Sequence, residues 1–217
     1  MTQDPARSRA PAEYQDRADA LLAMLHSDFG VPRPERTVIA VAGESGSGKS
    51  VTAIDLSAVL NDAGVSTVII HQDNYFVRPP RTNHEHRLRD IGSVGPHEVQ
   101  TAVIQSHITA FRNGVPNVAA PIVNYPGNRF GTQALDFSQT RVLVVEGTYA
   151  LLLDDIDLGI FLQATYHDTA DRRRKRARDI DDPFVEQVLE IEHRLIAPQG
   201  DRADILIDRD FTMSRRS

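Results

Sequence analysis

A glycine-rich loop at residues 43–50 constrains this chain more than any other stretch of its sequence. The letters GESGSGKS fit the pattern G-x-x-x-x-G-K-[ST], and they follow an apolar, β-branched run at 37–42. Glycines let successive backbone N–H groups point inward, and a helix that begins directly after them adds the positive end of its dipole. The pattern predicts a strand, a loop that encloses phosphate groups and a helix at 49–61. The alternative is a glycine-rich turn with a coincidental lysine.

The loop predicts roles for individual residues. The Lys49 ammonium would reach the β- and γ-phosphates of a nucleotide, and the Ser50 hydroxyl would ligate magnesium. The predicted cofactors are therefore ATP and Mg²⁺. The expected nucleotide contacts are the residues of the loop and the one after it: Gly43, Glu44, Ser45, Gly46, Ser47, Gly48, Lys49, Ser50 and Val51.

Length and composition narrow the class of protein. The 217 residues are enough for one sizeable domain, and lysine plus arginine number 24 against 30 aspartates and glutamates, for a formal charge of −6. That balance argues against a protein that coats nucleic acid or an anionic membrane. The absence of cysteine excludes disulfides and thiolate metal sites. No apolar run approaches the ~20 residues of a membrane span, and the first residues lack a signal-like apolar segment, so we expect a cytoplasmic protein.

Short apolar runs alternate with helical patterns along the rest of the chain. This alternation is typical of an α/β fold, with a mostly parallel sheet covered by helices on both faces. We expect residues 77–95 to be loop and 117–135 to form a hairpin or an excursion. Further strands are expected at 66–70, 141–145, 158–162 and 203–208, and further helices at 18–29, 96–112, 169–180 and 183–196.

Two carboxylates follow strands of the predicted sheet. Open parallel sheets bind ligands at the carboxyl ends of their strands, which is where Asp73 and Glu146 stand. Asp73 could orient an acceptor hydroxyl and accept its proton, or it could start a turn. Glu146 could hold Mg²⁺ or cap the next helix, and Asp73 is a further metal candidate. The aromatic neighbours Tyr75 and Phe76 favour a substrate pocket at the same strand end.

A basic segment at 168–182 has three interpretations. It places six basic residues within 172–178, with aspartates on both sides. It could be a solvated helix with i,i+4 ion pairs, a nucleic-acid patch, or a lid whose arginines stabilise the charge of a transferred phosphoryl group. We favour the lid, with Arg172 and Arg176 as catalytic candidates and Arg178 as an ATP contact.

The motifs disfavour two classes of nucleotide-binding protein. A GTPase usually reads guanine through an Asn-Lys-x-Asp motif, and neither of the two lysines follows an asparagine. A transporter ATPase would carry an LSGGQ-like stretch, which this sequence lacks. A small-molecule kinase remains, because such an enzyme needs an acceptor base and a lid. The rival interpretation is a regulatory protein that binds a nucleotide without an acceptor.

Together these motifs resemble the uridine kinase/phosphoribulokinase family of P-loop kinases. The resemblance runs from about residue 37 to 210 and rests on GESGSGKS, on DNYF at 73–76, on VVEG at 144–147, on the basic segment and on Ala203-Asp204. It implies a three-layer P-loop NTPase fold and ATP- and Mg²⁺-dependent phosphorylation of a hydroxyl. It further implies Asp73 as base, Glu146 near the metal, and adenine near the lid and residues 200–203.

The resemblance also divides the chain. Residues 1–36 would be an N-terminal tail with a short amphipathic helix, and 37–217 the P-loop kinase domain, with its lid at about 168–182. The helix at 18–29 could dock on its own domain or pair with a second subunit, so a homo-oligomer is possible.

The sequence departs from the family where the acceptor would bind. In place of an acidic D-H-P-D-A-F-like segment it reads DIGSVGPHEV, where only Asp90 could substitute, and the stretch PIVNYPGNRFGTQ offers Tyr125 and Arg129 but no histidine. With Tyr75, these are the candidate substrate contacts. We predict uridine or a related nucleoside as the acceptor. A sugar phosphate bound by arginines of 78–89, pantothenate or nicotinamide riboside remain alternatives.

Overall fold

A six-stranded sheet forms the centre of the molecule. The computed structural model describes residues 12–170 and 183–216, and it orders the strands β2-β5-β1-β6-β7-β8. In this sheet every neighbouring pair is parallel except β7 and β8. The predicted mostly parallel α/β fold is therefore confirmed. The strands are β1 (Thr37–Gly43), β2 (Thr67–His71), β5 (Val142–Glu146), β6 (Leu158–Leu162), β7 (Ile205–Ile207) and β8 (Met213–Arg215).

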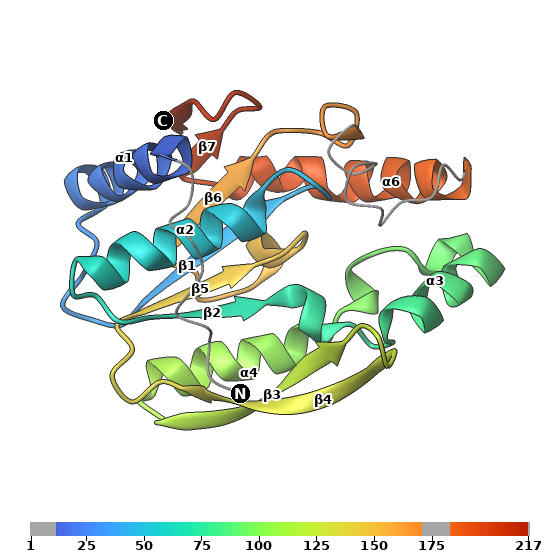
Figure 1. Cartoon of the computed structure of the whole chain (residues 1–217), viewed down its shortest axis with the longest axis horizontal. Coiled ribbons are helices and arrows are strands. Elements are labelled where there is room, and N and C mark those ends of the chain that lie inside the picture. The colour runs from blue at the N-terminus through green and yellow to red at the C-terminus, as the bar shows by residue number, and fades with distance from the viewer. Residues whose placement is uncertain (1–11, 171–182, 217) are drawn as a thin grey trace.

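Helices cover both faces of this sheet (Figure 1). The described helices are α1 (Ala12–Phe29), α2 (Lys49–Asp62), α3 (Pro80–Arg89), α4 (Thr101–Arg112) and α6 (Pro183–Ile196). Short 3₁₀ turns join several elements: η1 (Gln72–Tyr75), η2 (Ile91–Ser93), η3 (Pro96–Glu98), η4 (Ala150–Leu152) and η5 (Ala197–Arg202). A separate antiparallel hairpin, β3 (Asn117–Asn124) with β4 (Arg129–Asp136), confirms the hairpin expected at 117–135.

The central strand β1 has one buried cluster on each side. Val38 and Ala40 belong to a cluster that includes Ile108 of α4, whereas Ile39 and Val41 belong to the cluster formed with α1 and α2. All four β1 side chains are fully buried. Successive side chains of a strand point to opposite faces, so an unbroken apolar run gives a strand that is buried on both sides.

The N-terminal helix α1 packs on its own domain. Leu21 and Leu25 are buried in the same cluster as Leu56 and Leu60 of α2. This contact is one of the two arrangements that the sequence left open. Among the described residues, no helix is long and apolar enough to cross a membrane.

The expectation that residues 77–95 form a loop is wrong. Most of this stretch is helix α3, which begins with a proline in its first turn, a favourable position for proline. Helices are recognised in a sequence by an apolar stripe, but the buried residue of α3 is Asn83, and its one large apolar side chain, Leu88, is 53% exposed. Polar tertiary contacts hold α3 instead: Asn128 Oδ1 accepts a bond from the Arg81 N–H at 2.8 Å.

Two other helix predictions need comment. The single helix expected at 96–112 is divided into η3 and α4, with Val99 and Gln100 between them in non-helical conformations. The helix expected at 169–180 and the greater part of the lid lie at 171–182, outside the described residues. This is also where the candidate side chains Arg172, Arg176 and Arg178 stand.

Candidate active site

The glycine loop connects β1 to α2 as the sequence predicts. Gly43, Gly46 and Gly48 have φ angles of 155°, 77° and 107°, which disfavour residues with a side chain. At Gly43 a Cβ atom would also lie 2.8 Å from Ser47 Oγ and 2.9 Å from the Leu162 carbonyl oxygen. The loop therefore requires glycine for both conformation and space, and its backbone curls over the N-terminus of α2.

Two of the three predicted metal ligands, Ser50 and Glu146, lie side by side. The Ser50 hydroxyl donates to Glu146 Oε2 at 3.1 Å, and Glu146 is 3% exposed at the end of β5. The other carboxylate oxygen, Oε1, lies 2.8 Å from His71 Nδ1. No role for His71 was predicted, although β2 pairs with β5 and the register places His71 opposite Glu146. The oxygen pair of Ser50 and Glu146 fits a hard cation such as Mg²⁺.

No protein cage for a metal accompanies this pair. Across residues 12–170 and 183–216, no group of three or more histidine, aspartate or glutamate side chains could hold an ion by itself. Mg²⁺ is commonly held by one or two protein oxygens together with substrate phosphates. The arrangement therefore fits an ion that arrives with a nucleotide.

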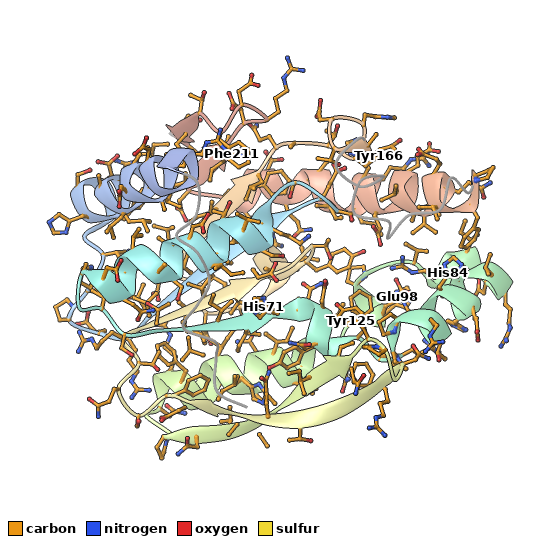
Figure 2. The ribbon with its side chains drawn as sticks, viewed as in Figure 1. His71, His84, Glu98, Tyr125, Tyr166 and Phe211 are labelled. Carbon is orange, nitrogen blue, oxygen red and sulfur yellow. The ribbon has the colours of Figure 1, made fainter. Side chains whose placement is uncertain are left out.

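A cleft of about 540 Å³ opens beside the loop and brings phosphate and acceptor residues together. Ser45 and Lys49 line one part of it, and Asp73 of η1 lines the same cavity. Tyr125 also lines the cleft, as the sequence predicts. Figure 2 labels Tyr125 at the end of the hairpin and His84 on α3, and both elements border the cleft. Its volume lies in the range of small-molecule sites.

Three of the predicted acceptor contacts lie elsewhere. Tyr75 is 1% exposed in the core, its hydroxyl lies 3.0 Å from His107 Nδ1, and burial raises its pKa. Asp90 accepts a bond from the Gly92 N–H and caps η2, while Arg129 is exposed on β4, and neither lines the cleft. The sequence placed Tyr75 near the right strand end, but a residue of η1 can point to either side, and Tyr75 points into the core.

The sequence missed an ion cluster in the cleft wall. Arg87 of α3 donates from Nε to Glu98 Oε1 and from Nη2 to Glu98 Oε2, both at 2.7 Å, and Nη2 also donates to Glu192 Oε1 of α6 at 2.9 Å. The Glu98 side chain has no exposed area, while those of Arg87 and Glu192 are 14% and 13% exposed. Arg87 appeared in the sequence only as one of several arginines, and nothing there linked residues that are 105 positions apart.

The pKa values of the two carboxyls move in opposite directions. Burial by itself would raise the pKa of Glu98, but hydrogen bonds from Arg87, the Gly95 N–H and Asn83, with the Arg87 charge, hold it below its ordinary value. Burial raises the pKa of Glu192 above its ordinary value, and the Arg87 charge offsets only part of that rise. Glu98 is therefore the more acidic of the two carboxyls that pair with Arg87.

Glu44 connects the loop to residues 166–169, directly before the part of the predicted lid that lies outside the described residues. Its buried carboxylate accepts from the Tyr166 N–H at 2.7 Å and lies 2.6 Å from His193 Nδ1. The Thr169 hydroxyl donates to the Ser45 carbonyl at 3.1 Å. The side chain of Glu44 therefore holds neighbouring segments in place, so a contact to phosphate would come from its backbone.

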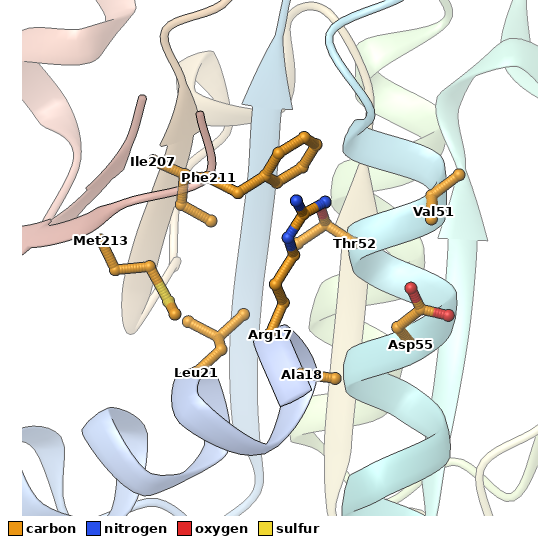
Figure 3. A pocket seen from close by; sticks show the side chains of 9 residues that line it. All are labelled: Arg17, Ala18, Leu21, Val51, Thr52, Asp55, Ile207, Phe211 and Met213. Carbon is orange, nitrogen blue, oxygen red and sulfur yellow. The ribbon is translucent and has the colours of Figure 1, made fainter. Parts of the chain in front are cut away.

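A second, smaller pocket lies on the other side of the first turns of α2 (Figure 3). Val51 and Asp55 of α2 line it together with Arg17 of α1 and Phe211, and the Arg17 guanidinium lies 4.1 Å from the centre of the Phe211 ring. A Cβ atom on Gly48 would lie 3.4 Å from the Phe211 ring, so this pocket adjoins the phosphate loop.

The expected position of adenine near residues 200–203 does not fit the sheet. Asp204 and Gly159 are joined by two bonds at the amino end of β6, from the Gly159 N–H to Asp204 Oδ2 and from the Asp204 N–H to the Gly159 carbonyl. The phosphate loop follows the carboxyl end of β1, and β1 runs parallel to β6. The segment at 200–203 therefore lies at the opposite edge, whereas the residues that follow β7, including Phe211, lie at the loop's edge.

This geometry falls within a match to a known family. Residues 38–214 match the model described as the phosphoribulokinase / uridine kinase family. The chain belongs to this family. The matched residues include the phosphate loop, Asp73, Glu146 and α6. The chain is therefore a P-loop small-molecule kinase of the phosphoribulokinase / uridine kinase family.

Curated relatives of this family member differ in their acceptors. The uridine kinase of Staphylococcus carnosus is 28% identical over 184 residues, which cover 79% of this chain and 86% of that protein. The bifunctional alpha-galactosidase/sucrose kinase of Mediterraneibacter gnavus is 28% identical over 189 residues, 81% of this chain, but the chain spans only 20% of that longer protein. Both relatives are named as kinases, but one is named for sucrose and the other for uridine as the acceptor.

Solved structures share the fold of this family member. A possible uridine kinase from Bacillus stearothermophilus has a TM-score of 0.61 at 17% identity, covering 89% of this chain and 98% of that one. Phosphoribulokinase from Rhodobacter spheroides has a TM-score of 0.60 at 17% identity, covering 80% and 70%. At such identities the likeness shows the fold alone.

Proposed function

We propose that the protein transfers the γ-phosphoryl group of ATP to a hydroxyl of a small molecule bound in the cleft. The observation that carries this proposal is the single cavity that Lys49 of the phosphate loop and Asp73 both line. A nucleotide-binding regulator needs the loop but has no need of a carboxylate facing the place of the terminal phosphate.

Each residue of the site has a role in this reaction. Lys49 and the loop N–H groups bind the phosphates, and Asp73 orients the acceptor hydroxyl. The hydroxyl oxygen forms the new bond to the γ-phosphorus, the bond from that phosphorus to the β,γ-bridging oxygen breaks, and the hydroxyl proton passes to Asp73. Ser50 and Glu146 would hold Mg²⁺, which neutralises phosphate charge when it is bound. The lid arginines Arg172, Arg176 and Arg178 remain predicted contacts.

We propose that the nucleobase of ATP lies near Phe211. The phosphates extend from the N-terminus of α2, and the pocket at Val51 and Phe211 adjoins that turn. The ring of Phe211 is a surface on which a base can stack. This position replaces the one near residues 200–203.

Uridine or a related nucleoside is our leading acceptor, since uridine kinases are among the relatives that the chain matches over most of their length. A sugar is the second candidate, and it is supported by the similarity to the sucrose kinase. Both are small molecules with several hydroxyls, and both fit the volume of the cleft.

The test is ADP release from ATP and Mg²⁺ across a panel of nucleosides, sugars, sugar phosphates and vitamins. Lys49→Ala should weaken ATP binding and turnover together, because Lys49 contacts the phosphates in both states. Asp73→Asn should leave ATP affinity near normal and lower kcat by about 10²- to 10⁴-fold, the usual effect of losing a general base. Turnover by Asp73→Asn at the wild-type rate would refute the base assignment. Absence of stimulation by any acceptor would favour the regulatory protein.

A further inference from the structure

The inner wall of the cleft carries polar atoms that the phosphate chemistry does not use. Asn83 lines the cleft and is 6% exposed, and its Oδ1 atom has no hydrogen-bond partner in the part of the chain that the structure describes. The Tyr149 hydroxyl, 1% exposed, likewise has none. Buried polar groups are nearly always satisfied in folded proteins. Of these two residues Asn83 lines the cleft and Tyr149 does not, so Asn83 is the unsatisfied polar side chain that a ligand in the cleft could meet.

Glu192 presents a free acceptor on this wall. Its Oε1 atom accepts the bond from Arg87 Nη2, while its Oε2 atom makes no hydrogen bond with any described residue, and the side chain keeps 13% exposure inside the cleft. Arg87 is fixed by its two bonds to Glu98, so it holds Glu192 in one orientation. A carboxylate held in this way is a strong acceptor for hydroxyl donors.

Among the described residues, the charges around the cleft balance. Around it and directly behind its wall, the described residues supply three cations and three carboxylates: Lys49, Arg78 and Arg87 against Asp73, Glu98 and Glu192. The positive charge of Arg87 is shared by two carboxylates and cannot serve an anionic ligand without leaving Glu98 buried and unpaired. A phosphate or carboxylate on the acceptor would instead face the Glu192 carboxylate, and like charges at close range repel.

The rest of the wall is apolar and aromatic. Phe76 and Tyr125 line the cleft from the side of β2 and the hairpin, and Phe184 and Leu189 of α6 line it as well. A molecule that fits such a cleft has an uncharged ring with one apolar face and several hydroxyls along its edge. Sugars and the ribose of nucleosides have this chemistry, whereas phosphorylated sugars and carboxylate vitamins do not.

We propose that Glu192, held by Arg87, selects the acceptor: its free oxygen binds adjacent hydroxyls of an uncharged polyhydroxylated molecule, and its charge excludes phosphorylated or carboxylate acceptors. This inference rests on the proposed kinase function and narrows its substrate class. It excludes the sugar phosphate and pantothenate alternatives. In this proposal Glu192 of α6 binds the acceptor and does not bind the phosphates of the nucleotide.

The first experiment uses the unmodified full chain. ADP release is measured with ATP and Mg²⁺ for matched pairs of acceptors whose phosphate sits on different hydroxyls, such as uridine with uridine 3′- and 5′-monophosphate and glucose with glucose 1-phosphate and glucose 6-phosphate. We expect the uncharged member of a pair to be phosphorylated at a kcat/KM at least tenfold above that of its phosphorylated partner. Preference for the phosphorylated member of any pair would overturn the inference and leave the kinase function intact. ATP binding without ADP release for every acceptor would overturn both.

The second experiment uses two variants on the same helix. Glu192→Gln keeps the shape of the side chain and removes its charge. A hydrogen bond to a charged group strengthens binding about tenfold more than one to a neutral group, and two hydroxyls would make two such bonds. We expect the KM for the acceptor to rise about 10- to 100-fold, with the Kd for ATP unchanged. The control, Glu190→Gln, removes an exposed carboxylate that pairs with Arg194, and it should leave both constants unchanged.

The outcomes of this second experiment are distinct. An unchanged acceptor KM in folded Glu192→Gln would overturn the inference. Thermal unfolding shows whether the variant is folded, and the matched pairs measured on the wild-type chain decide the question if it is not. A weaker affinity for ATP in Glu192→Gln, with an unchanged acceptor KM, would assign Glu192 to the nucleotide and also overturn the proposal.

Discussion

Replacing Arg87 with alanine removes the cation from a fully buried carboxylate. Glu98 has no exposed side-chain area, and Arg87 supplies two of its four hydrogen bonds, both at 2.7 Å; the others come from Asn83 Nδ2 at 2.8 Å and the Gly95 N–H at 3.0 Å. Breaking a buried ion pair from one side costs about 3–5 kcal/mol, because the remaining charge is uncompensated. The two remaining donors and protonation of Glu98 relieve part of this cost, so we expect about 3 kcal/mol.

Thermal unfolding measures this loss. For a chain of this size, 1 kcal/mol lowers Tm by about 2–4 °C, so Arg87→Ala should lower Tm by roughly 6–12 °C. Arg194→Ala is the matched control, since Arg194 also pairs with a glutamate of α6, but both side chains are more than half exposed. Exposed i,i+4 pairs contribute about 0.3–0.5 kcal/mol, which predicts a change below about 2 °C. Equal Tm values for the two variants would show that Glu98 does not depend on Arg87.

Two further predictions concern the loss of stability at low pH and the end of strand β5. The pKa of Glu98 in the folded chain lies below its ordinary value of 4.5, so ionised Glu98 stabilises the fold above about pH 4.5, and this contribution is lost as the pH falls through the folded pKa. In Glu98→Gln, Tm should therefore fall less steeply than in the wild type as the pH drops below about 4.5. An equally steep fall in both proteins would contradict the stabilising role of ionised Glu98. At Gly147 a Cβ atom would overlap the Gln72 side chain, so Gly147→Ala should cost roughly 1–3 kcal/mol in urea unfolding, whereas Gly131→Ala on the hairpin should cost less. An equal loss of unfolding free energy in the two variants would mean that the Gln72 side chain can move aside at no cost.

The phosphate loop was predictable because its chemistry is local. A strand that is buried on both faces needs an unbroken apolar run, and a phosphate loop needs glycines at fixed offsets before a helix. Gly43, Lys49 and Ser50 lie within eight residues of one another, and the backbone between them sets their geometry. The closeness of Ser50 and Glu146 follows from a general rule of parallel sheets, since the carboxyl ends of neighbouring parallel strands meet at one edge.

The acceptor side was predictable only in part. The sequence predicted Tyr75, Asp90, Tyr125 and Arg129 as substrate contacts, and of these only Tyr125 lines the cleft. The direction of a side chain in a short 3₁₀ turn depends on what packs around it, and Tyr75 found a buried partner in His107. Residue type and approximate position do not contain that information.

The sequence by itself determined the α/β sheet, the phosphate loop and the carboxylates at the strand ends, because hydrophobic period and glycine spacing act over a few residues. Only the tertiary structure decided how the acceptor wall is built. Helix α3 has no apolar stripe, and its inward residues Asn83 and Arg87 are stabilised by Glu98 and by Glu192, which is 105 positions beyond Arg87. A buried charge is tolerable only where a partner of opposite charge is brought to it, and the folding of the whole domain brings these partners together.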